Sequence, residues 1–96
     1  MSRIEKRIEK WRNSAFRQDV PKNEIESILD KYFPDEWTYG ETRGSHNYKI
    51  TSAKLKGHPY CGLGGDFVIP VKGGQKIKPI YIKQLVSIID ELGEDR

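Results

Sequence analysis

The stretch "DFVIPVKGGQKIKPIYIKQLVSII", residues 66–89, decides the fold because the spacing of its apolar residues changes from two to a helical period. The first part alternates, which predicts a β-strand with one buried face, at Phe67, Ile69 and Val71. Gly73 and Gly74 predict a turn, and Pro79 suits the first turn of a helix. That helix has one apolar stripe, which consists of Ile82, Leu85, Val86 and Ile89, and Gly93 predicts its end.

Two further strands are expected before this stretch. Trp37 and Tyr39 alternate with polar neighbours, and so do Tyr48 and Ile50, which predicts a hairpin whose turn lies at "RGS", residues 43–45. A long connection, residues 51–65, then leads to the third strand. Since Pro70 in that third strand cannot donate a ladder hydrogen bond, we expect it at a sheet edge or facing away from a partner.

The first third of the chain predicts two helices. Ser2 and Glu5 form a capping box before an amphipathic helix over residues 2–13, and residues 13–19 form a loop. Val20 and Pro21 then predict the first turn of a second helix, which should stop before Pro34. Its apolar stripe is Ile25, Ile28, Leu29, Tyr32 and Phe33.

The predicted order of elements is α-α-β-β-β-α. It indicates an α+β fold, a two-layer sandwich in which helices cover one face of a three-stranded antiparallel sheet and leave the other face open. A chain of 96 residues fits a single domain, residues 1–96.

Composition limits the setting and the cofactors. The single Cys61 cannot form an internal disulfide, and with two histidines it falls short of a structural zinc site. The start "MSRIEKRIEKWR" has charges where a secretory signal needs a continuous apolar stretch. No apolar run reaches the roughly 20 residues that span a bilayer. The sequence therefore predicts a soluble, cytoplasmic protein without a metal or other cofactor.

Basic residues are concentrated in one segment of the chain. Residues 43–83 hold eight Lys or Arg and the single acid Asp66, a net charge of +7, whereas the whole chain carries +3. Such asymmetry favours a polyanionic partner, most simply nucleic acid. The alternative is that these lysines only solvate a strand-rich half of the molecule.

His46 is the first candidate for chemistry. It begins the second predicted strand on the same face as Tyr48 and Ile50, which places it at the rim of the core. An imidazole there can act as a general acid or base, and the peptide groups and hydroxyl of Gly44 and Ser45 can bind phosphate oxygens. The alternative is a hydrogen-bonded histidine that merely ends a strand.

Other candidate chemistries fit the sequence less well. Ser45 and His46 are adjacent in a strand and point to opposite faces, so they cannot form a serine nucleophile pair. The run "CGLGGD", residues 61–66, lacks the lysine, hydroxyl and helix start of a phosphate-binding loop, and predicts a hairpin tip. His58, within the same connection, is expected at the surface.

The lysines before the last helix are a second candidate site. Lys72, Lys76 and Lys78 precede Pro79, where free N–H groups and the helix dipole add positive potential. We expect this region to attract phosphate groups. Ordinary solvated lysines are the alternative.

The motifs "TRGSHNYKI" (42–50) and "FVIPVKGGQKIKPIYIKQLVSIID" (67–90) resemble the HicA family of type II toxin-antitoxin systems, whose members are mRNA interferase toxins. The family pattern joins a helix, a strand that ends in R/K-G-S-H, an aromatic-rich second strand, a third strand that ends in V/I-P-V, a glycine turn with lysines and a lysine-proline helix. The similarity runs from about residue 21 to 91, so residues 20–92 are expected to be a HicA-like core and residues 1–19 a helical extension.

The resemblance implies a fold like that of double-stranded-RNA-binding domains and a toxin that cleaves mRNA as a metal-independent endoribonuclease. It implies that His46 is catalytic and that a HicB-type antitoxin protein is a partner. The expected RNA-binding residues are Arg43, Gly44, Ser45, Lys49, Lys72, Lys76 and Lys78.

The chain also departs from the family pattern. Asn47 and Lys72 stand where many members have histidines, and the connection 51–65 is longer than usual. The second proton-transfer group is therefore open, with His58 as one candidate. A noncatalytic RNA-binding module and a domain that chiefly binds the antitoxin remain alternatives.

Overall fold

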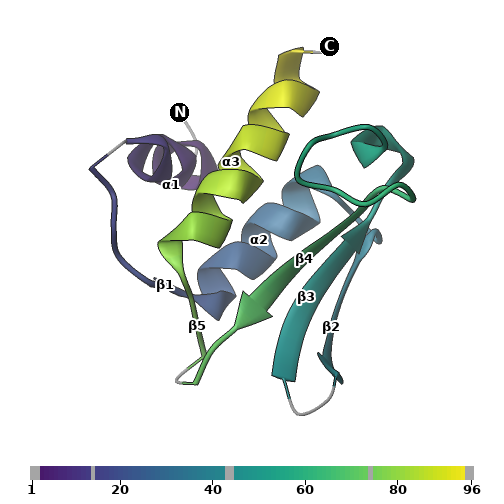
Figure 1. Ribbon diagram of the computed structural model, residues 1–96. Helices are drawn as coiled ribbons and strands as arrows, with labels where there is room; N and C mark the ends of the chain where they lie inside the picture. The colour runs from purple at the N-terminus through teal and green to yellow at the C-terminus, as the bar shows by residue number, and fades with distance from the viewer. Residues whose placement is uncertain (1–2, 14, 43–44, 74, 95–96) are drawn as a thin grey trace.

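The computed structural model describes residues 3–13, 15–42, 45–73 and 75–94. Its helices are α1 (Arg3–Arg12), α2 (Lys22–Tyr32) and α3 (Pro79–Glu94), with a 3-10 turn at Ala53–Leu55. The strands are β1 (Val20–Pro21), β2 (Trp37–Thr42), β3 (Ser45–Thr51), β4 (Asp66–Val71) and β5 (Lys76–Ile77). The expected α+β class, with helices beside a three-stranded antiparallel sheet, is confirmed (Figure 1).

The sheet has the order β2-β3-β4, with β3 in the centre. Tyr48 of β3 lies opposite Tyr39 of β2 and Ile69 of β4, so these three side chains share one face. Pro70 lies in β4, an edge strand of this sheet, where its missing N–H costs no ladder hydrogen bond.

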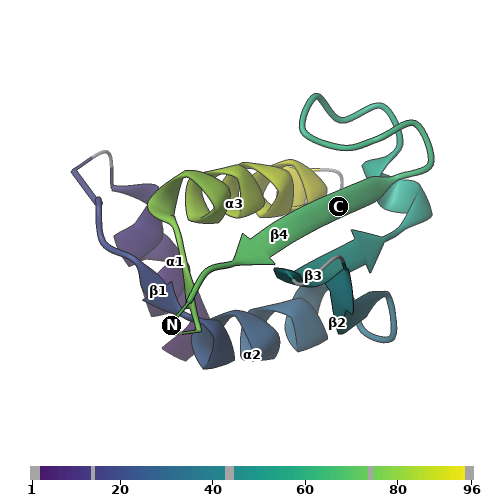
Figure 2. The same ribbon diagram turned by 60° about the horizontal axis from the view of Figure 1, so that its bottom comes forward.

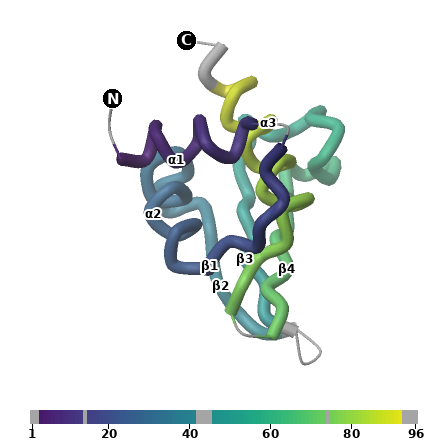
Figure 3. The backbone as a smooth tube through the Cα atoms, turned by 90° about the vertical axis from the view of Figure 1, so that its left-hand side faces the viewer, coloured from purple at the N-terminus to yellow at the C-terminus, as the bar shows by residue number. Residues whose placement is uncertain are grey.

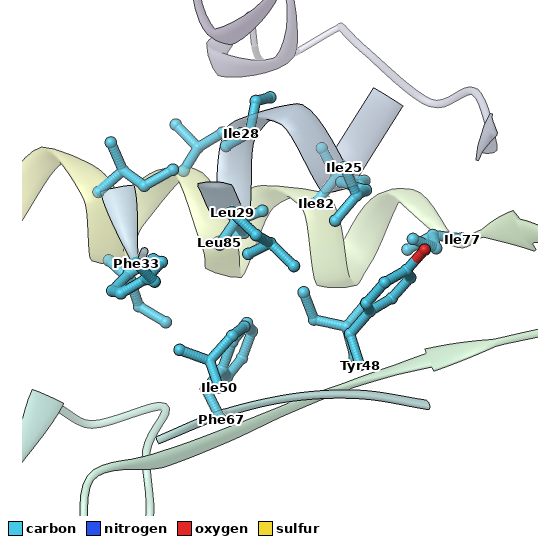
Figure 4. Close-up of a cluster of buried hydrophobic side chains, with 14 of the residues drawn as sticks. Ile25, Ile28, Leu29, Phe33, Tyr48, Ile50, Phe67, Ile77, Ile82 and Leu85 are labelled. Atoms are coloured by element: carbon cyan, nitrogen blue, oxygen red, sulfur yellow. The ribbon is translucent and has the colours of Figure 1, made fainter. Parts of the chain in front are cut away.

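Helices α2 and α3 cover one face of the sheet, as Figure 2 shows. The core between these layers is apolar because the helical stripes and the inward strand residues meet there (Figure 4). Its fully buried members include Ile25, Ile28, Leu29, Tyr48, Ile50, Ile69, Ile82 and Leu85. This packing fixes which sheet face is covered and which is open.

Helix α1 packs on the outer side of the two core helices and adds a layer that the two-layer prediction lacks (Figure 3). Its apolar residues Ile8 and Trp11 are buried. An ion pair joins Arg7 to Glu24 of α2 at 3.0 Å, and another joins Arg12 to Asp90 of α3.

Two predictions about element ends are wrong. Val20 and Pro21 do not begin α2 but pair with Ile77 and Lys76 of β5, because Pro21 is extended (φ −60°, ψ 140°). Gly93 does not end α3, which continues to Glu94, since a glycine costs a helix only about 1 kcal/mol. Ser2 of the capping box lies outside the described residues.

Gly65, at the end of the 51–65 connection, generates a testable prediction. Its φ is +84°, and a Cβ there would lie 2.2 Å from the carbonyl oxygen of Ser52. Gly65→Ala should therefore lower the free energy of unfolding by at least about 2 kcal/mol. The measurement is urea unfolding beside Gly62→Ala, whose Cβ would meet nothing nearer than 3.9 Å. Equal stability of the two variants would contradict the described loop conformation.

Candidate functional site

The candidate site lies at the end of the molecule where β2 passes into β3 and β4 into β5, which we call the turn end (Figure 1). His46 at the start of β3 lies opposite Val71, the last residue of β4. The backbone N–H of Lys22, the first residue of α2, donates to the carbonyl of Gln75 in the β4–β5 turn. One end of the molecule therefore combines a histidine, two turns and a helix start.

His46 is exposed, although it projects from the same face as the buried Tyr48. Its ring stacks on that of Tyr39, with a centroid separation of 5.7 Å and an interplanar angle of 11°. Strand alternation explains this placement, because side chains two apart share a face and the helices cover Tyr48. His46 is thus held by an aromatic neighbour while its ring remains accessible to a ligand.

A network beneath His46 connects the sheet to α2. The hydroxyl of Tyr48 donates to Oε2 of Glu26 at 2.5 Å, and Nζ of Lys22 lies 3.5 Å from the same oxygen. Lys22 also places its ammonium 4.6 Å above the ring centroid of Tyr39. Burial, helped by the hydrogen bond to Glu26, raises the pKa of Tyr48 well above its ordinary value near 10. Tyr48 therefore supports the site and does not exchange protons near neutral pH.

The three predicted lysines of the β4–β5 region are all exposed and belong to the turn end. Lys72 follows β4, and its Nζ lies 2.5 Å from a carboxylate oxygen of Asp19. Lys76 lies in β5, and Lys78 directly precedes α3. Together with Lys22 they provide cations at the end of the sheet that carries His46.

The remaining predicted RNA-binding residues are distributed differently. Lys49 is exposed on the opposite face of the sheet from His46, since it lies one residue from Tyr48 and opposite Thr38 and Val68. Arg43 and Gly44 lie outside the described residues. Ser45 begins β3 opposite Thr42.

His58 is not at the surface, so that expectation is wrong. Its side chain is 7% exposed and packs against α3, where Nε2 lies 2.8 Å from Oε2 of Glu91 without the alignment of a hydrogen bond. Its Nδ1 accepts the backbone N–H of Tyr60. The five residue steps of β3 from His46 to Thr51, at about 3.3 Å each, place roughly 17 Å between His46 and the 51–65 connection. His58 is therefore too far away to be the proton-transfer partner of His46.

Neither a cluster of metal ligands nor a membrane-spanning helix occurs in the described residues. Over the ranges 3–13, 15–42, 45–73 and 75–94, no three His, Cys, Asp or Glu residues gather as a metal site would require. In the same described part of the chain, no helix is both long and apolar enough to cross a bilayer. Cys61 is half-buried, and burial raises the pKa of its thiol, which disfavours a reactive thiolate.

In comparisons with known proteins, no family model, no curated protein and no solved structure matches this chain. Its proposed chemistry therefore rests on the residues at the turn end and on the motif resemblance.

Sequence reasoning missed Tyr39, which stacks on His46, and Lys22, whose ammonium lies over the Tyr39 ring. It assigned Tyr39 only to a strand, and it did not single out Lys22 at all. The hairpin register places Tyr39 diagonally across from His46, two residue pairs away on the same face, so alternation could have found it. Lys22 reaches the Tyr39 ring only because α2 docks on the sheet, and no local pattern carries that information.

The raised pKa of Tyr48 generates a second prediction. Above pH 10 a tyrosine in the unfolded chain loses its proton while buried Tyr48 keeps it, so stability falls by about 1.4 kcal/mol per pH unit. Tyr48→Phe removes this dependence and costs about 1–3 kcal/mol at pH 8 because the hydrogen bond to Glu26 is gone. Urea unfolding gives the free energy of unfolding of both proteins at pH 8 and pH 11. The advantage of wild type over Tyr48→Phe should be smaller at pH 11.

The control for this prediction is Tyr60→Phe. Tyr60 is 48% exposed, so loss of its hydroxyl should change the free energy of unfolding little at either pH. If the free energies of unfolding of wild type and Tyr48→Phe differ by the same amount at both pH values, Tyr48 is not buried in its protonated form.

Proposed function

We propose that this protein is a metal-independent endoribonuclease, the toxin component of a toxin-antitoxin system, with His46 as a catalytic residue. The observation that supports it most is the accessible imidazole of His46 at an end of the sheet that also carries Lys22, Lys72, Lys76 and Lys78. The resemblance of "RGSHNYKI" (43–50) and the I-P-V turn to HicA toxins supports the same activity.

The proposed reaction uses the RNA itself as nucleophile. Attack of the ribose 2′-hydroxyl on the adjacent phosphorus needs one group to accept the hydroxyl proton and another to protonate the leaving 5′-oxygen. His46 supplies one of these groups. No metal-bound water is needed in such a reaction, because the nucleophile is part of the substrate.

The lysines of the turn end would hold the phosphate backbone beside His46. Salt-dependent binding follows from such contacts, because each neutralised phosphate releases counterions. Lys49, on the other face of the sheet, would contribute only if RNA wraps around the edge strand β2 or β4.

The proposed fold relationship is to double-stranded-RNA-binding domains, and the proposed protein partner is a HicB-type antitoxin that covers His46.

A noncatalytic RNA-binding module is the second candidate. The stacked rings of Tyr39 and His46 favour it, since exposed aromatic rings bind unpaired bases by stacking without any cleavage. The replacement of family histidines by Asn47 and Lys72 is also compatible with an absence of turnover. Activity measurements separate the two candidates.

The third prediction concerns the two histidines. His46→Ala should lower RNA cleavage by about 10²- to 10⁴-fold, the usual contribution of a general acid or base. His58→Ala is the matched control, because His58 lies near the far end of the sheet. Gel analysis of a defined RNA incubated with each purified, folded variant in EDTA gives the rates.

Full cleavage by His46→Ala would refute a catalytic role for His46. If wild type binds the RNA but leaves it intact, while circular dichroism shows folded protein, the binding module becomes the better description.

The fourth prediction concerns the lysines of the turn end. In a His46→Ala background, which keeps the RNA uncut, Lys76→Gln combined with Lys78→Gln should weaken binding at physiological salt. The slope of log affinity against log salt should become shallower by about 0.7 for each phosphate that the variant no longer neutralises. Fluorescence anisotropy measures both the affinity and its salt dependence. The control is Lys54→Gln combined with Lys56→Gln, at the distant 3-10 turn. Equal weakening by both pairs would argue against a localised RNA site.

A further inference from the structure

We propose that Glu41 is the second proton-transfer residue of this site and acts as the general base, while His46 acts as the general acid. The inference rests on the proposed ribonuclease function and names the group that the sequence left open. It starts from the hairpin register, in which Glu41 of β2 and His46 of β3 are directly opposite each other.

Directly opposite residues of an antiparallel pair project from the same face, with Cβ atoms about 5 Å apart. Both Glu41 and His46 are exposed, so a substrate can reach the two side chains together. A separation of this size lets the carboxylate and the imidazole contact the 2′-oxygen and the 5′-oxygen of one phosphodiester. The pair therefore meets the basic geometric requirement of an acid-base site.

The other described candidates near His46 are already engaged or too distant. Glu26 accepts the hydroxyl of Tyr48 and lies beside Lys22. Asp19 is paired with Lys72. His58 lies beyond the far end of β3, against Glu91.

Tyr39 has a positioning role in this arrangement. It precedes Glu41 by two residues on the same strand face, and its ring stacks on His46. The stack restrains the imidazole plane, while the underlying contact with Lys22 anchors Tyr39 to α2. His46 is thereby held beside the strand that carries Glu41.

The assignment of roles follows from ordinary side-chain chemistry. A carboxylate is ionised near neutral pH and can accept a proton, whereas the imidazolium form of a histidine can donate one. The 2′-hydroxyl proton passes to Glu41 as the 2′-oxygen bonds to phosphorus, and the bond from phosphorus to the 5′-oxygen breaks. The imidazolium of His46 protonates that oxygen. The products are a 2′,3′-cyclic phosphate and a 5′-hydroxyl, and no oxidant or other reactant is needed.

The first test is Glu41→Gln, which keeps size and removes the base. Because Glu41 is exposed, the substitution should leave the fold intact, and kcat on a defined RNA should fall about 10²- to 10⁴-fold. Glu36→Gln, at the opposite end of β2 from Glu41, is the matched control and should cleave like wild type.

The second test separates the two roles with an activated substrate, uridine 3′-(4-nitrophenyl phosphate). Its nitrophenolate leaves without protonation, so His46→Ala should turn it over within about tenfold of wild type. Glu41→Gln should remain slow, because the 2′-hydroxyl still needs a base. The release of nitrophenolate is followed by absorbance.

The outcomes are distinguishable. If wild type cleaves RNA and Glu41→Gln cleaves it equally well, the inference is overturned and the proposed function stands. If His46→Ala is slow on the activated substrate while Glu41→Gln is fast, the assigned roles are overturned. If folded wild type cleaves neither substrate, the proposed function fails and the inference fails with it.

Discussion

The packing of one sheet face against α2 and α3 is the constraint on which the rest of the structure depends. Because β3 is the central strand and side chains alternate along it, burying Tyr48 and Ile50 fixes the direction of His46 as well. His46 is the next residue on that face toward the turn end, where it is exposed. A slip of one residue in the register would send His46 to the open face and turn Asn47 and Lys49 toward the core.

The same packing assembles the electrostatics of the turn end. Docking of α2 brings Lys22 and Glu26 to the aromatic rings of the hairpin, and the β1–β5 pairing brings the loop containing Asp19 to the lysines of the β4–β5 turn. The proposed ribonuclease site thus combines charges from segments that are far apart in the sequence. Helix α1 lies on the other side of α2 and α3 from the sheet and contributes to stability rather than to this end.

Much of the fold could be predicted because it is periodic. The stripe Ile82, Leu85, Val86 and Ile89 and the alternation at Tyr48 and Ile50 each have a local signal, and these residues are buried. The two-residue strands β1 and β5 are too short for any period to appear. The buried side chain of His58 lies against Glu91 of α3, a tertiary contact that no local pattern records. The position of His46 could be predicted because side chains alternate along the strand. The contacts of Lys22 with Tyr39 and of Glu26 with Tyr48 could not, because they form only when α2 packs on the sheet.

The chemistry of the RNA ends tests the central claim most directly. Purified wild-type protein is incubated with a defined RNA in EDTA, and the fragments are analysed by mass spectrometry. The account predicts a 2′,3′-cyclic phosphate, or its hydrolysed 3′-phosphate, on one fragment and a 5′-hydroxyl on the next. Fragments with 3′-hydroxyl and 5′-phosphate ends, or RNA that stays intact in the presence of folded protein, would contradict it.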